Sequence, residues 1–311
     1  MDSKLYPKLT IGLPVYNGEI FLHQCLDSIL KQTFSDFELI ISDNASTDST
    51  RKICAQYVTK DNRIKYFRQD VNIGIHRNFN FLLNQAKSEY FAWTAVDDYL
   101  SPDFMEKNLT ILESNKHIVS SMGKIVPYDS SFLKINSDII ETTKYPKFIR
   151  NYVKQHRHKK MMDTFSVSGD FDKKFRLFLK KTKSLGRFYG VHRTSQLEKC
   201  IIEKPFINVE VSVFLNLLNL GDFYEEQSTI LYSFDEGISS RGIINMAKYS
   251  GHNWFEILFP FFPFTKWTIQ NFGILLFVKN LDIFLRMNIG GEFALLIDFL
   301  IKINNFFKSF H

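Results

Sequence analysis

The chain has 311 residues, of which 45% are hydrophobic and 23% are charged, a balance typical of folded proteins and not of disordered ones. Its three cysteines are widely spaced and form no Cys-x-x-Cys pair, which argues against a disulfide framework and against a cysteine zinc site. The first ten residues lack the apolar segment of a signal peptide. We therefore expect a protein of the reducing cytoplasm.

Charge and aromatic residues divide the chain into three regions. The net charge is +6 overall, yet segment 144–187 holds 14 Lys and Arg residues against three acids, a local charge of +11. The last 71 residues, 241–311, hold 13 of the 32 phenylalanines. A mixed N-terminal region therefore precedes a basic middle region and an aromatic tail. No stretch reaches the ~18 uncharged apolar residues that a membrane-spanning helix needs.

The N-terminal region alternates short apolar runs with segments of helical periodicity. Apolar runs that stop at turn residues predict strands at 9–16, 37–41, 64–67 and 90–95. Apolar residues three and four positions apart, together with cap residues, predict helices at 19–32, 48–59 and 78–86. Ser101 and Pro102 predict the start of a further helix, with proline at its first position.

Strands that alternate with helices indicate right-handed crossovers and a mainly parallel, Rossmann-like α/β sheet with helices on both faces. Ligands of such sheets bind at the carboxyl ends of the strands. Polar residues stand at three of these ends, at positions 16–17, 43–44 and 97–98. The topology therefore predicts a ligand site at this edge of the sheet.

The turn after the first strand narrows the class of ligand. It lacks the G-x-G-x-x-G of dinucleotide-binding folds, and the chain lacks the G-x-x-x-x-G-K-S/T of a P-loop. The adjacent acids Asp97 and Asp98 at a strand end repel each other, which a bound metal explains better than a solvated turn does. Mg²⁺ and Mn²⁺ prefer oxygen ligands, so the pair favours a divalent ion that bridges phosphates.

Several motifs occur in a fixed order over the first hundred residues. They are 11–19 (IGLPVYNGE), 28–34 (SILKQTF), 37–48 (FELIISDNASTD), 72–74 (NIG), 78–80 (NFN) and 90–98 (YFAWTAVDD). Together they resemble the family 2 glycosyltransferases, which have the GT-A fold. The resemblance covers roughly residues 8–240. It implies transfer of a sugar from a nucleotide diphosphate sugar to an acceptor hydroxyl, with inversion at the anomeric carbon.

The resemblance also implies roles for the residues at the strand ends. The nucleotide-sugar-binding positions of the family correspond to Pro14, Tyr16, Asp43, Asn44, Arg77 and Asp97, and its metal ligand to Asp98. In this interpretation Tyr16 stacks on the base, Asp43 accepts a hydrogen bond from it, and Asp97 contacts the ribose. Mg²⁺ or Mn²⁺ would be the cofactor. Packing for Tyr16, helix capping for Asp43 and simple exposure for Arg77 are the structural alternatives.

The second half of the chain matches the family less closely. Segment 186–193 is similar to an acceptor-side strand, and Glu210, at the start of an apolar helix, is similar to the catalytic acid that deprotonates the acceptor. That acid is usually Asp, and an acid at a helix start is also a common partner of the helix dipole. Val96 replaces a third acid of many relatives. No histidine stands near 232–236, where Asp235 or Glu236 could substitute.

We therefore divide the chain into a nucleotide-sugar-binding half (1–115), an acceptor-side half (116–240) with the basic insertion 144–187, and an aromatic tail (241–311). The insertion could bind nucleic acid, form a solvated loop, or face anionic lipid headgroups or a lipid-linked diphosphate; we favour the lipid interpretation. Segments 274–287 and 293–307 predict amphipathic helices in a membrane interface. Packing on the enzyme core or on a second subunit is the alternative, so an oligomer remains open.

These observations predict a metal-dependent glycosyltransferase at the cytoplasmic face of a bacterial membrane. It would build cell-surface polysaccharide or lipopolysaccharide on a saccharide or lipid-linked saccharide acceptor, without a nucleic-acid partner. The alternative is a catalytically impaired relative that binds a sugar nucleotide or serves as a scaffold. Val96, Glu210 and the missing histidine support that alternative.

Overall fold

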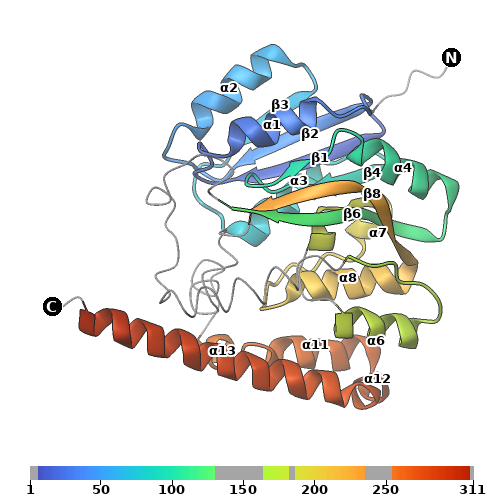
Figure 1. Cartoon of the computed structure of the whole chain (residues 1–311), viewed down its shortest axis with the longest axis vertical. Helices are drawn as coiled ribbons and strands as arrows, with labels where there is room; N and C mark the ends of the chain where they lie inside the picture. Colours follow the sequence, from blue (N-terminus) through green and yellow to red (C-terminus); the bar gives the residue numbers. More distant parts are fainter. Residues whose placement is uncertain (1–5, 130–163, 182–185, 235–253, 309–311) are drawn as a thin grey trace.

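The computed structural model describes residues 6–129, 164–181, 186–234 and 254–308. Within them the chain forms one eight-stranded sheet with the strand order β3-β2-β1-β4-β7-β6-β8-β5 (Figure 1). The strands are β1 (Leu9–Val15), β2 (Phe37–Asp43), β3 (Ile64–Arg68), β4 (Tyr90–Trp93), β5 (Tyr99–Leu100), β6 (Ile118–Tyr128), β7 (Val191–Arg193) and β8 (Asp222–Phe234).

Helices separate the strands and continue into the tail. Those of the sheet region are α1 (Leu22–Leu30), α2 (Thr50–Lys60), α3 (Ile75–Gln85), α4 (Phe104–Ser114), α6 (Phe171–Lys181), α7 (Thr194–Glu198) and α8 (Val209–Leu220). The tail holds α10 (Trp254–Leu258), α11 (Phe262–Phe272), α12 (Ile274–Lys279) and α13 (Leu281–Lys308). In the described residues no helix is long and apolar enough to cross a membrane.

The predicted mainly parallel sheet is confirmed. Strands β3, β2, β1 and β4 pair in parallel, as do β6 and β8, whereas β7 and β5 pair antiparallel with their neighbours. Strands β1, β2 and β4 are buried along their whole length, which is why they read as continuous apolar runs. The sheet joins 9–128 to 191–234, so the two expected halves share it; the division into halves stays a prediction.

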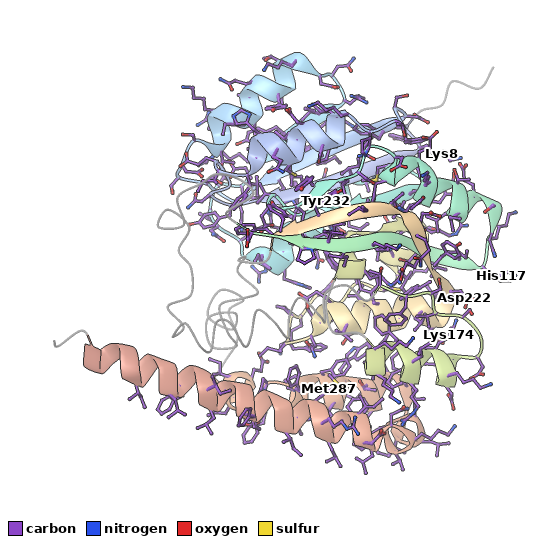
Figure 2. All side chains as sticks on the ribbon, in the orientation of Figure 1. Lys8, His117, Lys174, Asp222, Tyr232 and Met287 are labelled. Carbon is purple, nitrogen blue, oxygen red and sulfur yellow. The ribbon has the colours of Figure 1, made fainter. Side chains whose placement is uncertain are left out.

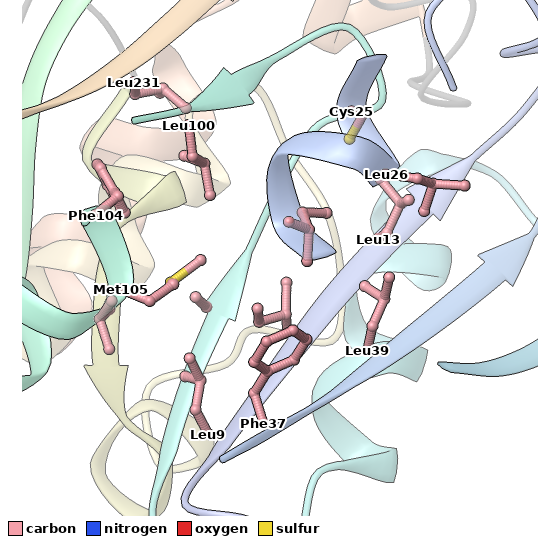
Figure 3. Close-up of a cluster of buried hydrophobic side chains, with 14 of the residues drawn as sticks. Leu9, Leu13, Cys25, Leu26, Phe37, Leu39, Leu100, Phe104, Met105 and Leu231 are labelled. Atoms are coloured by element: carbon pink, nitrogen blue, oxygen red, sulfur yellow. The ribbon is translucent and has the colours of Figure 1, made fainter. Parts of the chain in front are cut away.

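Helices cover both faces of the sheet, as predicted. On one face α1, α2 and α4 pack on alternate strand residues such as Leu13 and Leu39 (Figure 3). On the other face α3, α7 and α8 pack on the intervening residues, which include Ile40 and Phe91. Because successive apolar side chains of each strand point to opposite faces of the sheet, the same few strands contribute to both cores.

Strand β8 has a register shift against β6. Gly123 pairs with Glu226, but the next residue of β6 pairs with Ile230, so residues 227–229 are extra in β8. Thr229 from this segment is buried, and its Oγ1 would lie 2.5 Å from a Cβ at Gly123. Glycine is therefore needed at 123 to admit the inserted segment.

The tail forms a further layer beyond α8, and α6 joins it to the sheet (Figure 1). Phe284 of α13 lies with Phe264 and Phe175 in the second core. Arg176 of α6 donates to Asp282, with Nη1 to Oδ1 at 2.9 Å. At the other side of α6, Lys174 Nζ donates to Asp222 Oδ1 at 3.1 Å, and these two residues lie close together in Figure 2.

The expected tail helices at 274–287 and 293–307 are wrong in their bounds. A short α12 ends at Lys279, and α13 then runs unbroken from Leu281 to Lys308. Gly291 lies inside α13, where a Cβ would stand 2.5 Å from the Phe261 ring. The glycine is thus a packing position and not a helix end, which the sequence pattern alone does not reveal.

Two other expectations differ from the structure. Helix α4 begins at Phe104 with Asp103 as its N-cap, so Pro102 is not its first residue; the Pro102 carbonyl instead accepts a hydrogen bond from Thr33 N at 2.8 Å. The expected strand at 186–193 is a 3₁₀ helix (Gly186–Tyr189) followed by the short β7. In both places tertiary contacts decide the local geometry.

His192 of β7 is fully buried beside Trp93 and Phe214. Its Nε2 donates to the Phe188 carbonyl at 3.2 Å, and within the described part of the chain its Nδ1 has no hydrogen-bond partner. Burial lowers the pKa of His192 to about 3, because a charged imidazolium would lose its hydration. The folded chain therefore keeps this histidine neutral.

This burial predicts acid sensitivity. Between pH 6.5 and about 3 the unfolded chain binds a proton at His192 that the folded chain refuses, so the free energy of unfolding falls as the pH falls, with a limiting slope of about 1.4 kcal/mol per pH unit. Urea titrations of the wild type and of His192→Gln at pH 4.5–7.5 measure this contribution. His117→Gln, at an exposed histidine, is the control; equal slopes for wild type and His192→Gln would contradict the assignment.

Candidate active site

The carboxyl ends of β1, β2, β4 and β8 lie on one side of the molecule. In Figure 2, β8 runs leftward from Asp222 toward Tyr232, and β1 runs the same way from its start beside Lys8. Asp97 and Asp98 follow β4 at this edge, in a turn closed by a hydrogen bond from Asp98 N to the Ala95 carbonyl at 3.2 Å. The edge predicted from topology is therefore where the acid pair stands.

Asp98 is held by the end of β8. Its side chain is 3% exposed, and Oδ1 accepts a hydrogen bond from Phe234 N at 3.2 Å. The hydroxyl of Ser233 also contributes a hydrogen bond. A residue 136 positions away in the chain thus fixes the orientation of this carboxylate.

Asp97 is held through its main chain. Its carbonyl accepts a hydrogen bond from the hydroxyl of Tyr128 at the end of β6, while its side chain is half-buried. Tyr128 in turn packs against Tyr99 and Phe234. Among the described contacts, the Asp97 carboxylate forms no ion pair.

The two acids strain each other electrostatically. Burial raises the pKa of Asp97 to about 6. The pKa of Asp98 is raised well above its usual range, first by burial and then by the negative charge of Asp97. Two carboxylates that resist ionisation together are stabilised by a cation placed against both.

Val96, the residue before the pair, packs into the fold. A Cβ at Gly18 would lie 2.8 Å from Val96 Cγ2, so the turn after β1 closes on this valine. The position at which many relatives carry a third acid is therefore apolar here.

The ends of β1 and β2 form a cross-linked pair of turns. Asn17, at φ 51°, donates from its main chain to Ser46 Oγ at 2.9 Å and accepts at Oδ1 from Thr47 N at 2.8 Å. Tyr16 precedes this link with its side chain 47% exposed. Its ring is not part of either core and has a free surface beside the strand ends.

Asp43 is occupied by contacts within the protein. It is fully buried; Oδ1 accepts from Ser46 N at 2.8 Å and Oδ2 from the Tyr66 hydroxyl at 2.6 Å, with Arg68 Nε 3.6 Å away. The capping alternative is wrong, because α2 begins at Thr50 with Ser49 as its N-cap; these contacts instead fix the loop after β2. A role toward a base would use the remaining acceptor capacity of the two oxygens.

The other expected donor-site residues differ in exposure. Asn44 is buried and ties down the loop before α3, since its Oδ1 accepts from Ile73 N at 2.8 Å and its Nδ2 donates to Asn72. Pro14 is buried within β1. Arg77 is exposed on the first turn of α3.

Glu210 is the second residue of α8, two positions after Asn208, which caps the helix in a left-handed conformation at φ 71°. Its side chain is half-buried, and burial raises its pKa. Tyr189 relates this acid to the aspartate pair: after burial, the charges of Asp98, Asp97 and Glu210 raise the pKa of the Tyr189 phenol. The three acids therefore all act electrostatically on one phenol.

Tyr189 is the residue that the sequence did not identify as part of the site. It stands inside the segment 186–193 that resembles the family, and that resemblance was the available signal. Its neighbours in the site lie about 20 and 90 residues away along the chain, and local periodicity carries no information on such contacts.

Asp97 and Asp98 fit a divalent ion that takes its remaining ligands largely from the phosphates of a bound substrate. In the described residues no group of three or more His, Cys, Asp or Glu side chains could hold a metal by itself. Mg²⁺ commonly binds through one or two carboxylates together with substrate phosphates, which is what Asp97 and Asp98 can offer. Asp235, Glu236, His156 and His158 lie outside the described residues.

Comparison with known proteins agrees with this geometry. The model of the family described as "Glycosyl transferase family 2" matches residues 10–174, more than half of the chain. The glycosyltransferase GlyA of Streptococcus pneumoniae is 36% identical over 99 residues, which cover 32% of this chain and 14% of that protein. The chain spans less than half the length of the first curated relatives that it matches.

Solved structures share the fold. S. aureus TarS (residues 1–349) in complex with UDP has a TM-score of 0.54 at 19% identity, covering 73% of this chain and 60% of that one. The mannosyltransferase PcManGT of Pyrobaculum calidifontis, in complex with GDP-Man and Mn²⁺, has a TM-score of 0.55 at 14% identity, covering 97% and 76%. The expected GT-A fold with added C-terminal helices is confirmed, and the chain belongs to glycosyltransferase family 2.

Proposed function

We propose that the chain is an inverting glycosyltransferase that moves a sugar from a nucleotide diphosphate sugar to an acceptor hydroxyl. The observation that carries this proposal is the Asp97–Asp98 pair fixed at the carboxyl end of β4 by the end of β8, in a chain of a glycosyltransferase family. The acids are of two kinds in this arrangement. The two aspartates suit a phosphate-bound cation, and Glu210 suits proton transfer.

The donor would bind along the ends of β1, β2 and β4. The exposed ring of Tyr16 offers a stacking surface for the base, and Asp43 would accept a hydrogen bond from it. Pro14 and Asn44 shape the strand ends, Arg77 would approach the base or diphosphate, and Asp97 the ribose. The nucleotide-bound neighbours carry UDP in one case and GDP-Man in the other, so the base stays open.

Asp98, assisted by Asp97, would hold Mg²⁺ or Mn²⁺ against the diphosphate. Bound there, such an ion neutralises the negative charge that grows on the leaving group. The raised pKa of both acids supports the assignment, because groups strained in the free protein gain most from the ligand that relieves them. A neighbour solved with Mn²⁺ is consistent with it.

Glu210 would act as the general base. It takes the proton of the acceptor hydroxyl while that oxygen forms a bond to the anomeric carbon and the bond to the diphosphate breaks on the opposite side. Its partial burial supports the role, since burial raises the pKa of the carboxyl and so strengthens it as a base. A single displacement of this kind inverts the anomeric centre.

We place the enzyme at the cytoplasmic face of the cell membrane, on saccharide or lipid-linked acceptors for cell-surface polysaccharide or lipopolysaccharide. The basic segment 144–187 and the aromatic tail support a position at anionic lipid. The second candidate, a catalytically impaired sugar-nucleotide-binding or scaffold relative, is favoured by the apolar Val96 turn, by Glu210 in place of the usual Asp and by the missing histidine. Donor turnover with Mg²⁺ or Mn²⁺ in a panel of nucleotide sugars separates the two.

Asp98→Asn is expected to abolish metal-dependent donor turnover and at the same time to raise the melting temperature of the metal-free protein near pH 7.5. The amide can still accept the hydrogen bond from Phe234 N, while the repulsion between two buried carboxylates disappears. Asp61→Asn, at an acid paired with Arg63 on the surface, is the control and should keep turnover. A melting temperature lowered by Asp98→Asn, or retained turnover, would count against the metal site.

Metal-dependent nucleotide binding is expected to weaken at acid pH. The pKa of Asp97 is raised to about 6, so below that pH the carboxyl is protonated and no longer attracts the ion. Calorimetric titration of UDP and GDP with Mn²⁺ at pH 5, 6, 7 and 8 should show little change from 8 to 7 and a progressive loss below 6. Affinity that stays constant down to pH 5 would exclude Asp97 from the site.

Glu210→Gln is expected to keep nucleotide binding but to lose transfer by ~10²–10⁴-fold, the usual effect of losing a general base. Glu210→Asp should retain measurable transfer, because the usual acid of the family at this position is the shorter one. Glu198→Gln, at an exposed acid of α7, is the matched control. Transfer at the wild-type rate in Glu210→Gln would assign the base elsewhere.

A further inference from the structure

One surface of the tail exposes a series of large apolar side chains. Ile289 is 66% exposed and Phe293 63% exposed, although both belong to a regular helix. We call this surface the tail face; it consists of Ile274, Leu275, Val278, Leu281, Leu285, Ile289, Phe293, Leu296, Phe299, Leu300 and Ile303. At 3.6 residues per turn, its members from α13 fall within an arc of about 120°.

The tail face is not the face that holds α13 to the protein. The opposite side carries Ile283 and Phe284, both buried, and Gly291, which packs on Phe261. The helix is therefore anchored through one face while the other is left uncovered by the described residues. Monomeric soluble proteins rarely expose a continuous apolar surface of this extent without a partner.

Basic side chains border the tail face. Lys279 and Arg286 are exposed on the tail itself. On the neighbouring α6, Asp172 and Arg176 pair with Lys279 and Asp282 of the tail, and Lys180 continues along that side of α6. Segment 171–181 carries five basic residues against one acid. The exposed acids Asp282 and Glu292 also lie within the arc of the tail face.

The tail face also has a defined relation to the catalytic edge. In Figure 1, α13 begins beside α12 and α6 and runs below the sheet toward the side where the strands end. Side chains of α13 project away from the body in Figure 2, on the side opposite the sheet. A flat surface that covers the tail face would therefore lie beyond the tail layer, on the side away from the sheet.

We propose that the tail face is the contact of this protein with an anionic phospholipid bilayer, and that α12 and α13 lie flat in its interface. The inference rests on the proposed function in one respect: a bilayer contact would bring this glycosyltransferase to acceptors of the lipid-linked class. Apolar area on one side with basic residues at its margin is the pattern that binds such surfaces. A second copy of the chain would bring segment 171–181, with five basic residues against one acid, toward its own equivalent, whereas anionic headgroups would neutralise that charge.

The test uses the full chain and vesicles of phosphatidylglycerol and phosphatidylcholine. The wild type should float with mixed vesicles, less with phosphatidylcholine alone, and less at high salt, because exposed charges are screened beyond ~8–10 Å at physiological ionic strength. A triple variant, Ile289→Ser with Phe293→Ser and Leu296→Ser, should lose at least tenfold in partitioning. The control, Val58→Ser with Val71→Ser, replaces exposed apolar residues that lie far from the tail in the sequence. It should float like the wild type.

Two further measurements separate the possible failures. Lys180→Gln with Arg286→Gln should weaken binding to anionic vesicles and leave binding to neutral ones unchanged. UDP–Mn²⁺ binding, measured in parallel, should be the same in wild type and triple variant; its absence from both would contradict the proposed function but not the bilayer contact. Failure of the wild type to float overturns the inference. A wild-type dimer that the triple variant converts to monomers, without flotation, would instead identify a second copy as the occupant.

Discussion

Two carboxylates held side by side at the end of β4 set the requirements for the rest of the molecule. Asp98 is buried, and Asp97 adds its charge to that burial. Such a pair persists in the folded state only when surrounding structure fixes it, because each acid alone would turn toward solvent. Phe234 N and the Tyr128 hydroxyl provide that fixation from the ends of β8 and β6. The second half of the sheet therefore serves the acids contributed by the first half.

Much of the fold follows from local sequence. Strands β1, β2 and β4 are buried on both faces, and for that reason each appears as a continuous apolar run bounded by turn residues. Once strands alternate with helices, the position of Asp97 and Asp98 at the ligand-binding edge follows from topology. The α/β class and the acid pair were predictable because both depend on residues close in the chain.

The remainder depends on contacts between distant residues. Neither the hydrogen bond from Phe234 to Asp98 nor the electrostatic effect of Glu210 on Tyr189 has a local sequence signal, since the partners are far apart along the chain. Pro102 shows the same limit at a smaller scale, because a contact with Thr33 overrides the usual preference of proline for a helix start. For α13, Gly291 resembles a break in the sequence and is a packing position in the structure.

The tail illustrates how one helix can satisfy two environments. Phe284 and its neighbours belong to the protein interior, whereas Ile289 and Phe293 face outward. A helix that is apolar on nearly all sides shows little contrast between its faces, so periodicity predicts the helix but not which side the protein covers. Only the observed packing of α13 on α11 and α6 distinguishes the two sides.

The register shift in β8 has a consequence for how such chains can change in length. Residues 227–229 stand outside the regular pairing with β6, so they separate the part of β8 joined to α6 from the part that ends at Phe234. Insertions or deletions at this point would be absorbed locally and would not reverse the alternation of side chains further on. The part of β8 that contacts α6 can therefore change in length or register while the main-chain contact between Phe234 and Asp98 keeps its place.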